Sequence, residues 1–117
     1  MYVVFLDDER FPHNVTWMPI SGEFFEADQV VICRNMKDVQ FTVAKKGMPK
    51  IVSFDHDLGE NEPTGYDVAK WLVKLDMEDT SGAFKFPEDF SFTVHSKNPV
   101  GAKNIREYIN NYFKHRG

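Results

Sequence analysis

The sequence predicts an α/β domain: a mainly parallel sheet of four or five strands with helices on both faces, a three-layer α/β/α sandwich. Two observations support this class. Short apolar, β-branched and aromatic runs alternate with segments of helical periodicity, and polar residues directly follow three of the four runs. Strands that alternate with helices imply right-handed crossovers and parallel strand pairing. The length of 117 residues fits one domain, residues 1–117.

Four short apolar runs are the predicted strands. Residues 2–6 read YVVFL and show no polar alternation, which indicates a strand buried on both faces. Residues 30–33 read VVIC, 51–54 read IVSF and 90–94 read FSFTV. Residues 11–29 have a poor pattern with Pro and Gly, so we expect a loop with at most one irregular turn or short helix there.

The predicted helices are marked by their ends. The first spans residues 36–46, with Asn35 as a cap and Gly47 at its end. The second runs from Thr64 to about residue 77, and Asp67 at the third helical position completes a capping box.

A third helix begins at Asn98 with Pro99 in the first helical position, which Pro favours. Its predicted inner face carries apolar and aromatic residues at helical spacing: Ile105, Tyr108, Ile109 and Tyr112.

Composition excludes several classes of protein. The formal net charge is −4, so strong binding to duplex nucleic acid is not expected, although basic residues near the C-terminus allow local contact. The single cysteine, Cys33, cannot form an internal disulfide, and we interpret it as a buried apolar residue in a reducing compartment. No apolar run is long enough to span a bilayer, and acidic residues interrupt the N-terminus early, so we expect a cytoplasmic protein.

Chemically capable residues follow three of the predicted strands. The carboxyl ends of parallel strands share one edge of the sheet, where ligands of open α/β sheets bind. We therefore expect one cluster from positions far apart in the sequence. Its members are Asp7, Asp8, Asp55, His56, Asp57, His95 and Ser96.

The acidic members of this cluster indicate a metal site. Carboxylates gathered in one place repel one another, and a divalent cation offsets that repulsion. Oxygen ligands suit Mg²⁺ or Mn²⁺, which keep open positions for phosphate oxygens. The predicted metal ligands are Asp7, Asp8, Asp55 and Asp57. The alternative is that these acids form turns that bond their own backbone.

The remaining candidates suit phosphate chemistry. His56 lies between two acids that would raise its pKa, and His95 could protonate a leaving alkoxide, so both are candidate acids or bases together with Asp55 as a catalytic residue. The N-terminus of the last helix is a plausible phosphate seat. Candidate substrate-binding residues are Arg10, Ser96, Asn98 and Asn104. A surface salt bridge for Arg10 and a local cap for the residues around position 95 are the alternatives.

These motifs together resemble the cyclic-phosphate-processing receiver-like domain family. They extend over nearly the whole chain: LDDER at 6–10 with Pro12, FDHDLG at 54–59, TGYD at 64–67, and HSKNP at 95–99 with Gly101 and Asn104. The resemblance implies a receiver-like, flavodoxin-like fold and action on cyclic phosphates of nucleotides or RNA ends, in proteins of bacteria and their phages. Compared with an ordinary receiver, Asp7, Asp8 and Asp55 match the acidic residues, but a fifth strand ending in Lys is missing. Phospho-relay signalling is therefore not expected.

Four hypotheses for function follow. The first is a metal-dependent phosphoesterase with Mg²⁺ or Mn²⁺ that opens a cyclic phosphate of a nucleotide or RNA end. The second is a non-catalytic module that binds a phosphorylated ligand or a protein partner in the same pocket. The third is a phosphoacceptor receiver with Asp55 as nucleophile. A Toprim-like nuclease or primase fragment, based on Glu9 and the Asp55-x-Asp57 pair, ranks last because the turn after residue 6 lacks glycine.

Overall fold

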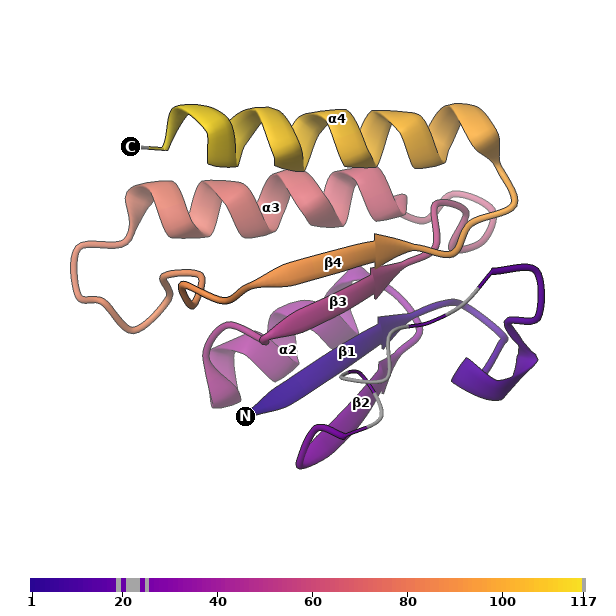
Figure 1. Cartoon of the computed structure of the whole chain (residues 1–117), viewed down its shortest axis with the longest axis horizontal. Helices are drawn as coiled ribbons and strands as arrows, with labels where there is room; N and C mark the ends of the chain where they lie inside the picture. Colours follow the sequence, from indigo (N-terminus) through magenta and orange to yellow (C-terminus); the bar gives the residue numbers. More distant parts are fainter. Residues whose placement is uncertain (19, 21–23, 25, 117) are drawn as a thin grey trace.

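The computed structural model describes residues 1–18, 20, 24 and 26–116, and in them a four-stranded parallel sheet lies against three long helices (Figure 1). The strands are β1 (Tyr2–Leu6), β2 (Gln29–Cys33), β3 (Ile51–Phe54) and β4 (Ser91–Val94). Their order across the sheet is β2-β1-β3-β4. The fold is a receiver-like α/β fold with a parallel sheet, as the sequence predicts.

The strand register aligns the last residues of all four strands. Leu6 pairs with Cys33 on one side and with Phe54 on the other, and Phe54 pairs with Val94. Residues one position further along are therefore neighbours at the carboxyl edge. The ladder continues by one bond per strand, because the N–H of Asp7, Asp55 and His95 donates to Cys33, Leu6 and Phe54 respectively. The register thus places Asp7, Asp55 and His95 in one row.

The helices begin where their capping residues predict. In α2 (Met36–Lys46) the Asn35 side chain accepts from the N–H of Asp38. The capping box of Thr64 and Asp67 opens α3 (Gly65–Glu78). In α4 (Pro99–His115) the Asn98 side chain accepts from the N–H of Gly101. Side chains that satisfy the first helical N–H groups fix these starts, which is why local sequence predicts them.

The larger core lies on one face of the sheet. The side chains of Val4 and Leu6 in β1 pack there against Val39 of α2 and Leu72 of α3, and Ile105 of α4 joins the same cluster. In Figure 1, α4 lies alongside α3 beyond β4, the edge strand of the sheet. Most of the apolar burial that stabilises the fold is therefore on this face.

A smaller core lies on the opposite face of the sheet. Val3, Phe5 and Ile51 meet Phe24 and the segment between β1 and β2, which contains a 3-10 helix, η1 (Pro12–Asn14). The three long helices contribute to the larger core cluster. The predicted loop at 11–29 includes residues 19, 21–23 and 25, which lie outside the described residues. Within the described part of the chain, every helix is too short or too polar to cross a membrane.

Candidate functional site

The centre of the site is a pair of carboxylates at the ends of β1 and β3. Asp7 and Asp55 are buried, and one ligand atom from each lies within 4.8 Å of the other and of a nitrogen of buried His95. The sequence interpretation required this convergence of residues that are 48 positions apart (55 minus 7). Parallel pairing of β1 with β3 provides it, since Asp7 and Asp55 directly follow the paired residues Leu6 and Phe54.

Asp7 is saturated with hydrogen-bond donors. Its Oδ1 accepts from the backbone N–H of Glu9 at 3.0 Å and of Arg10 at 2.9 Å. Its Oδ2 accepts from His95 Nε2 at 3.0 Å and from Arg10 Nη1 at 3.3 Å. Burial acts to raise the pKa of Asp7, but these donors outweigh it and hold the pKa below its ordinary value. Asp7 is therefore a buried anion.

His95 is a buried residue that holds the Asp7 carboxylate in place through a hydrogen bond. Its ring is fully buried and stacks on Phe5 with centroids 4.5 Å apart. Nδ1 lies 2.7 Å from the Ser53 hydroxyl, which in turn accepts from the Thr93 hydroxyl at 2.9 Å. A neutral ring with its proton on Nε2, donated to Asp7, satisfies the whole chain of hydrogen bonds. Burial lowers the pKa of His95, against the opposing effect of Asp7.

Asp55 has a different electrostatic environment from Asp7. Burial and the negative charge of Asp7 raise the pKa of Asp55 to about 6, although the N–H of His56, the Ser96 side chain and Arg10 act in the opposite direction. Arg10 Nη1 is 3.8 Å from Asp55 Oδ2. One guanidinium thus faces two carboxylates, and the pair retains excess negative potential.

A pocket of about 300 Å³ opens over this carboxylate pair. We call it the strand-end pocket, and its lining residues are Asp8, Glu9, Arg10, Asp55, Asp57, Gly59, Ser96, Lys97 and Asn98. Four acids and two cations share a small volume, so the pocket has both negative and positive sides. Such a surface can hold a cation and an anion next to each other. Of the predicted metal ligands, Asp8, Asp55 and Asp57 line it, whereas buried Asp7 is not among its lining residues.

His56 lies beside the strand-end pocket. Its Nδ1 is 2.9 Å from Asp57 Oδ1, and the Asn98 amide nitrogen is 3.5 Å from the same ring atom. The hydrogen bond to His56 is the main cause of the lowered pKa of Asp57. Gly101 gives the ring its space, because a Cβ there would lie 2.3 Å from His56 Cγ. The N-terminal turn of α4 therefore fixes the imidazole against the pocket wall.

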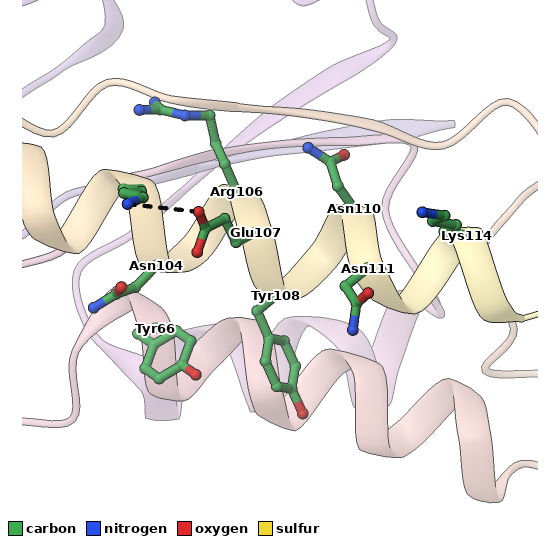
Figure 2. Close-up of a pocket in the computed structure, with 9 residues that line it drawn as sticks. Tyr66, Asn104, Arg106, Glu107, Tyr108, Asn110, Asn111 and Lys114 are labelled. Atoms are coloured by element: carbon green, nitrogen blue, oxygen red, sulfur yellow. Dashed lines mark ion pairs between the residues drawn. The ribbon is translucent and has the colours of Figure 1, made fainter.

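The predicted substrate-binding residues divide into two groups. Arg10, Ser96 and Asn98 line the strand-end pocket. Asn104 does not reach it, and lies instead in a second hollow of about 820 Å³ along α4, with Tyr66 and Tyr108 (Figure 2). From Asn98 to Asn104 the helix has turned and advanced by roughly 9 Å, which separates the two side chains. The sequence motif alone does not show this separation.

The donor set of the strand-end pocket fits a hard divalent cation. The carboxylates of Asp8, Asp55 and Asp57 offer oxygen ligands, the chemistry that Mg²⁺ and Mn²⁺ prefer. The raised pKa of Asp55 indicates that its charge lacks a sufficient partner. The oxygens of Asp7 already accept four hydrogen bonds. Asp7 therefore suits orientation and charge better than direct ligation.

Sequence reasoning missed three side chains around the site. The Ser53 hydroxyl contacts the His95 ring, and Thr93 of the adjacent strand donates to Ser53. Trp17 donates its indole N–H to the His95 carbonyl at 2.9 Å. Ser53 is the polar position of β3, and Thr93 is one of two polar residues in β4, the other being Ser91; a polar residue inside a short strand was the available signal. Only the β3–β4 register, which pairs them, shows that they act together. Trp17 belongs to a loop whose pattern carried no such signal.

Comparison with known proteins identifies a family. A family model for the cyclic-phosphate processing receiver domain matches residues 2–111. The match covers both acidic strand ends, β4 and most of α4. A search of curated proteins and a search of solved structures gave no match.

Proposed function

This chain belongs to the family of cyclic-phosphate processing receiver domains, and from that premise we propose that it is a metal-dependent phosphoesterase. Its substrate in this proposal is a cyclic phosphate of a nucleotide or of an RNA end. One observation carries the proposal: the strand-end pocket combines a carboxylate pair with excess negative charge and two cationic side chains. A phosphate ester and a divalent cation together match both signs of charge.

The acids have distinct roles in this reaction. Asp8, Asp55 and Asp57, which line the pocket, would hold Mg²⁺ or Mn²⁺ through their carboxylate oxygens. The ion, when bound, supplies positive charge that offsets carboxylate repulsion and polarises a phosphoryl oxygen. Asp7 has a separate role. It accepts hydrogen bonds from both the backbone N–H and the guanidinium of Arg10, and so it positions this lining residue of the pocket.

Hydrolysis of a cyclic phosphate needs one proton lost and one gained. A water oxygen bonds to phosphorus, one ring P–O bond breaks, and the departing oxygen takes up a proton as the water loses one. His56 is the better placed imidazole for this exchange, because it borders the pocket through Asp57. His95 is fully buried with both ring nitrogens hydrogen-bonded, which supports a role in orienting Asp7.

The reaction can be tested with purified protein and Mg²⁺ or Mn²⁺. We expect turnover of a 2′,3′- or 3′,5′-cyclic nucleotide, or of an oligoribonucleotide ending in a cyclic phosphate. Asp55→Asn should abolish turnover, and His56→Gln should reduce it by roughly 10²-fold or more. Asp89→Asn, a change of an exposed acid outside the pocket, is the matched control. A complete panel without product would reject the proposal.

A non-catalytic binding module is the second candidate, and the position of Arg10 favours it. Its guanidinium already lies within 4 Å of both Asp7 and Asp55, so the pair has a resident cation without a metal. In that case the pocket binds a phosphorylated ligand in the presence of EDTA. Calorimetry followed by recovery of intact ligand would select this function over hydrolysis.

A further inference from the structure

Trp17 is hydrogen-bonded to a residue next to the strand-end pocket. Its indole N–H donates to the carbonyl of His95, the residue that directly follows β4. The side chain is about a third exposed, with a relative surface of 36%. A large aromatic ring is thus held at the edge of a charged pocket by a hydrogen bond that joins two segments 78 positions apart.

Two cations of the pocket lie over this one ring. The guanidinium carbon of Arg10 is 5.0 Å from the Trp17 ring centroid, and Lys97 Nζ is 4.4 Å from it. Both residues line the strand-end pocket. The negative face of an indole attracts such cations within about 6 Å. The ring therefore helps to hold together two like charges that come from different ends of the chain.

The two cations are unequal in their other contacts. Arg10 also faces Asp7 and Asp55, at 3.3 and 3.8 Å. Among the described residues, Lys97 has no ion-pair partner within 4 Å, and its contact with the Trp17 ring is the one that positions its charge. A long Lys side chain without such a contact samples many rotamers, so the ring restricts where the ammonium group lies.

We propose that Trp17 is a positioning residue, which holds Arg10 and Lys97 as one cationic wall for the phosphate. This inference rests on the proposed function, because it assumes that the pocket binds a phosphate. As water adds to the phosphorus of a cyclic phosphate monoanion, negative charge builds on the non-bridging oxygens, and it passes to the departing ring oxygen when the ring P–O bond breaks. Cations fixed before the reaction stabilise that charge without having to reorganise.

Phosphate binding tests the positioning role of Trp17 without requiring any reaction. With inorganic phosphate and Mg²⁺ as the probe, we expect Trp17→Leu to weaken binding roughly tenfold in calorimetry. Trp17→Phe keeps an aromatic face and should recover most of the affinity. Both variants lose the bond to the His95 carbonyl, so equal weakening in the two would overturn the proposal in favour of a merely structural tryptophan.

Phe41→Leu is the matched control. Phe41 is an exposed aromatic residue of α2 with Lys45 Nζ 4.6 Å from its ring centroid, outside the pocket. Its loss should leave phosphate affinity unchanged. Thermal melts of all three variants separate lost binding from lost folding: a large fall in melting temperature with normal affinity for Trp17→Leu would also overturn the proposal.

Proton chemical shifts measure the contacts of Arg10 and Lys97 with the Trp17 ring directly, even in the absence of ligand. Protons over an aromatic face move upfield, so the Lys97 ε-methylene and Arg10 δ-methylene signals should lie upfield in the native protein and return toward ordinary positions in Trp17→Leu. Ordinary positions in the native protein would overturn the geometry.

Kinetics separate this inference from the proposed function. With a cyclic nucleotide as substrate, Trp17→Leu should lower kcat more than it raises KM, because the wall acts on charge that develops during the reaction. Native turnover with an unaffected Trp17→Leu overturns the role of Trp17 alone. A native protein that neither binds phosphate nor turns over any cyclic phosphate overturns the proposed function, and the positioning role with it.

Discussion

Two buried carboxylates at opposite ends of α3 show how differently the same group can be used. Asp55 precedes the helix and Asp76 lies near its end, with relative surfaces of 5% and 1%. Asp76 Oδ1 accepts from the N–H of Phe86 at 2.8 Å and from Arg116 at 2.9 Å, while its Oδ2 accepts from the Tyr112 hydroxyl. Asp55 faces a second carboxylate instead.

The difference lies in the balance of donors to charge. Around Asp76, three donors from distant segments join the end of α3 to the end of α4, and burial together with Asp76 raises the pKa of Tyr112 to about 12. Around Asp55, negative charge exceeds the donors, and its pKa rises to about 6. A carboxylate saturated with donors fixes the structure, whereas one with excess charge marks a place for a ligand cation.

The largest expected effect comes from the contact between Asp55 and the start of α3. A Cβ on Gly65 would lie 1.8 Å from the Asp55 carbonyl oxygen, so Gly65→Ala must displace the backbone of the site. We expect a loss of about 4 kcal/mol in the free energy of unfolding, measured with urea. Lys74→Ala, on the same helix but exposed, should change stability little. Similar stability of both variants would show that the contact can relax.

Asp76→Asn should destabilise the protein strongly. The substitution removes the buried charge that Arg116 and Tyr112 contact, and one amide cannot replace all of these hydrogen bonds. We expect a loss of about 3 kcal/mol in unfolding free energy, with phosphate binding unchanged in the folded protein. If phosphate affinity fell together with stability, the two carboxylates would not be independent.

Asp55→Asn should stabilise the protein, whereas Asp76→Asn destabilises it. In the metal-free protein at pH 7 to 8 we expect a gain of about 2 kcal/mol, because the substitution removes one of two facing carboxylates. The pKa of Asp55 is about 6 in the folded state against an ordinary 3.8. Between these values the folded state binds more protons than the unfolded state, so the contribution of Asp55 to stability falls as pH rises.

The gain from Asp55→Asn should therefore be small near pH 4 and complete above about pH 6, the folded pKa of Asp55. Urea unfolding of both proteins with EDTA, from pH 4 to 8, measures this difference. A destabilised Asp55→Asn protein at pH 7.5 would mean that Asp55 is as well partnered as Asp76, which would remove the contrast.

The smallest expected effect is that of Tyr112→Phe. It removes one of the three donors to Asp76 and leaves the ring in place against Phe113. We expect a loss of about 1 kcal/mol in unfolding free energy by thermal or urea unfolding. If the loss were as large as that of Asp76→Asn, most of the stabilisation from the hydrogen bonds to Asp76 would come from the tyrosine hydroxyl.

Local features of the chain were predictable because they act over a few residues. The caps at Asn35, Thr64 and Asn98 and the boundaries of β1 and β3 agree with the structure. The family resemblance is confirmed. The predicted receiver-like α/β fold with a parallel sheet is confirmed as well. The metal, the substrate and the residue roles remain predictions.

The sequence by itself determined the strands, the helices and the presence of acids and imidazoles at strand ends, because periodicity and capping depend on near neighbours. Only the tertiary structure decided that His95 is buried behind Asp7 while His56 borders the pocket, that Asn104 lies away from it, and that Trp17 meets Arg10 and Lys97. The contact of Asp7 with His95 joins residues 88 positions apart. Such contacts depend on strand register and on the packing of the whole chain, which no local pattern encodes.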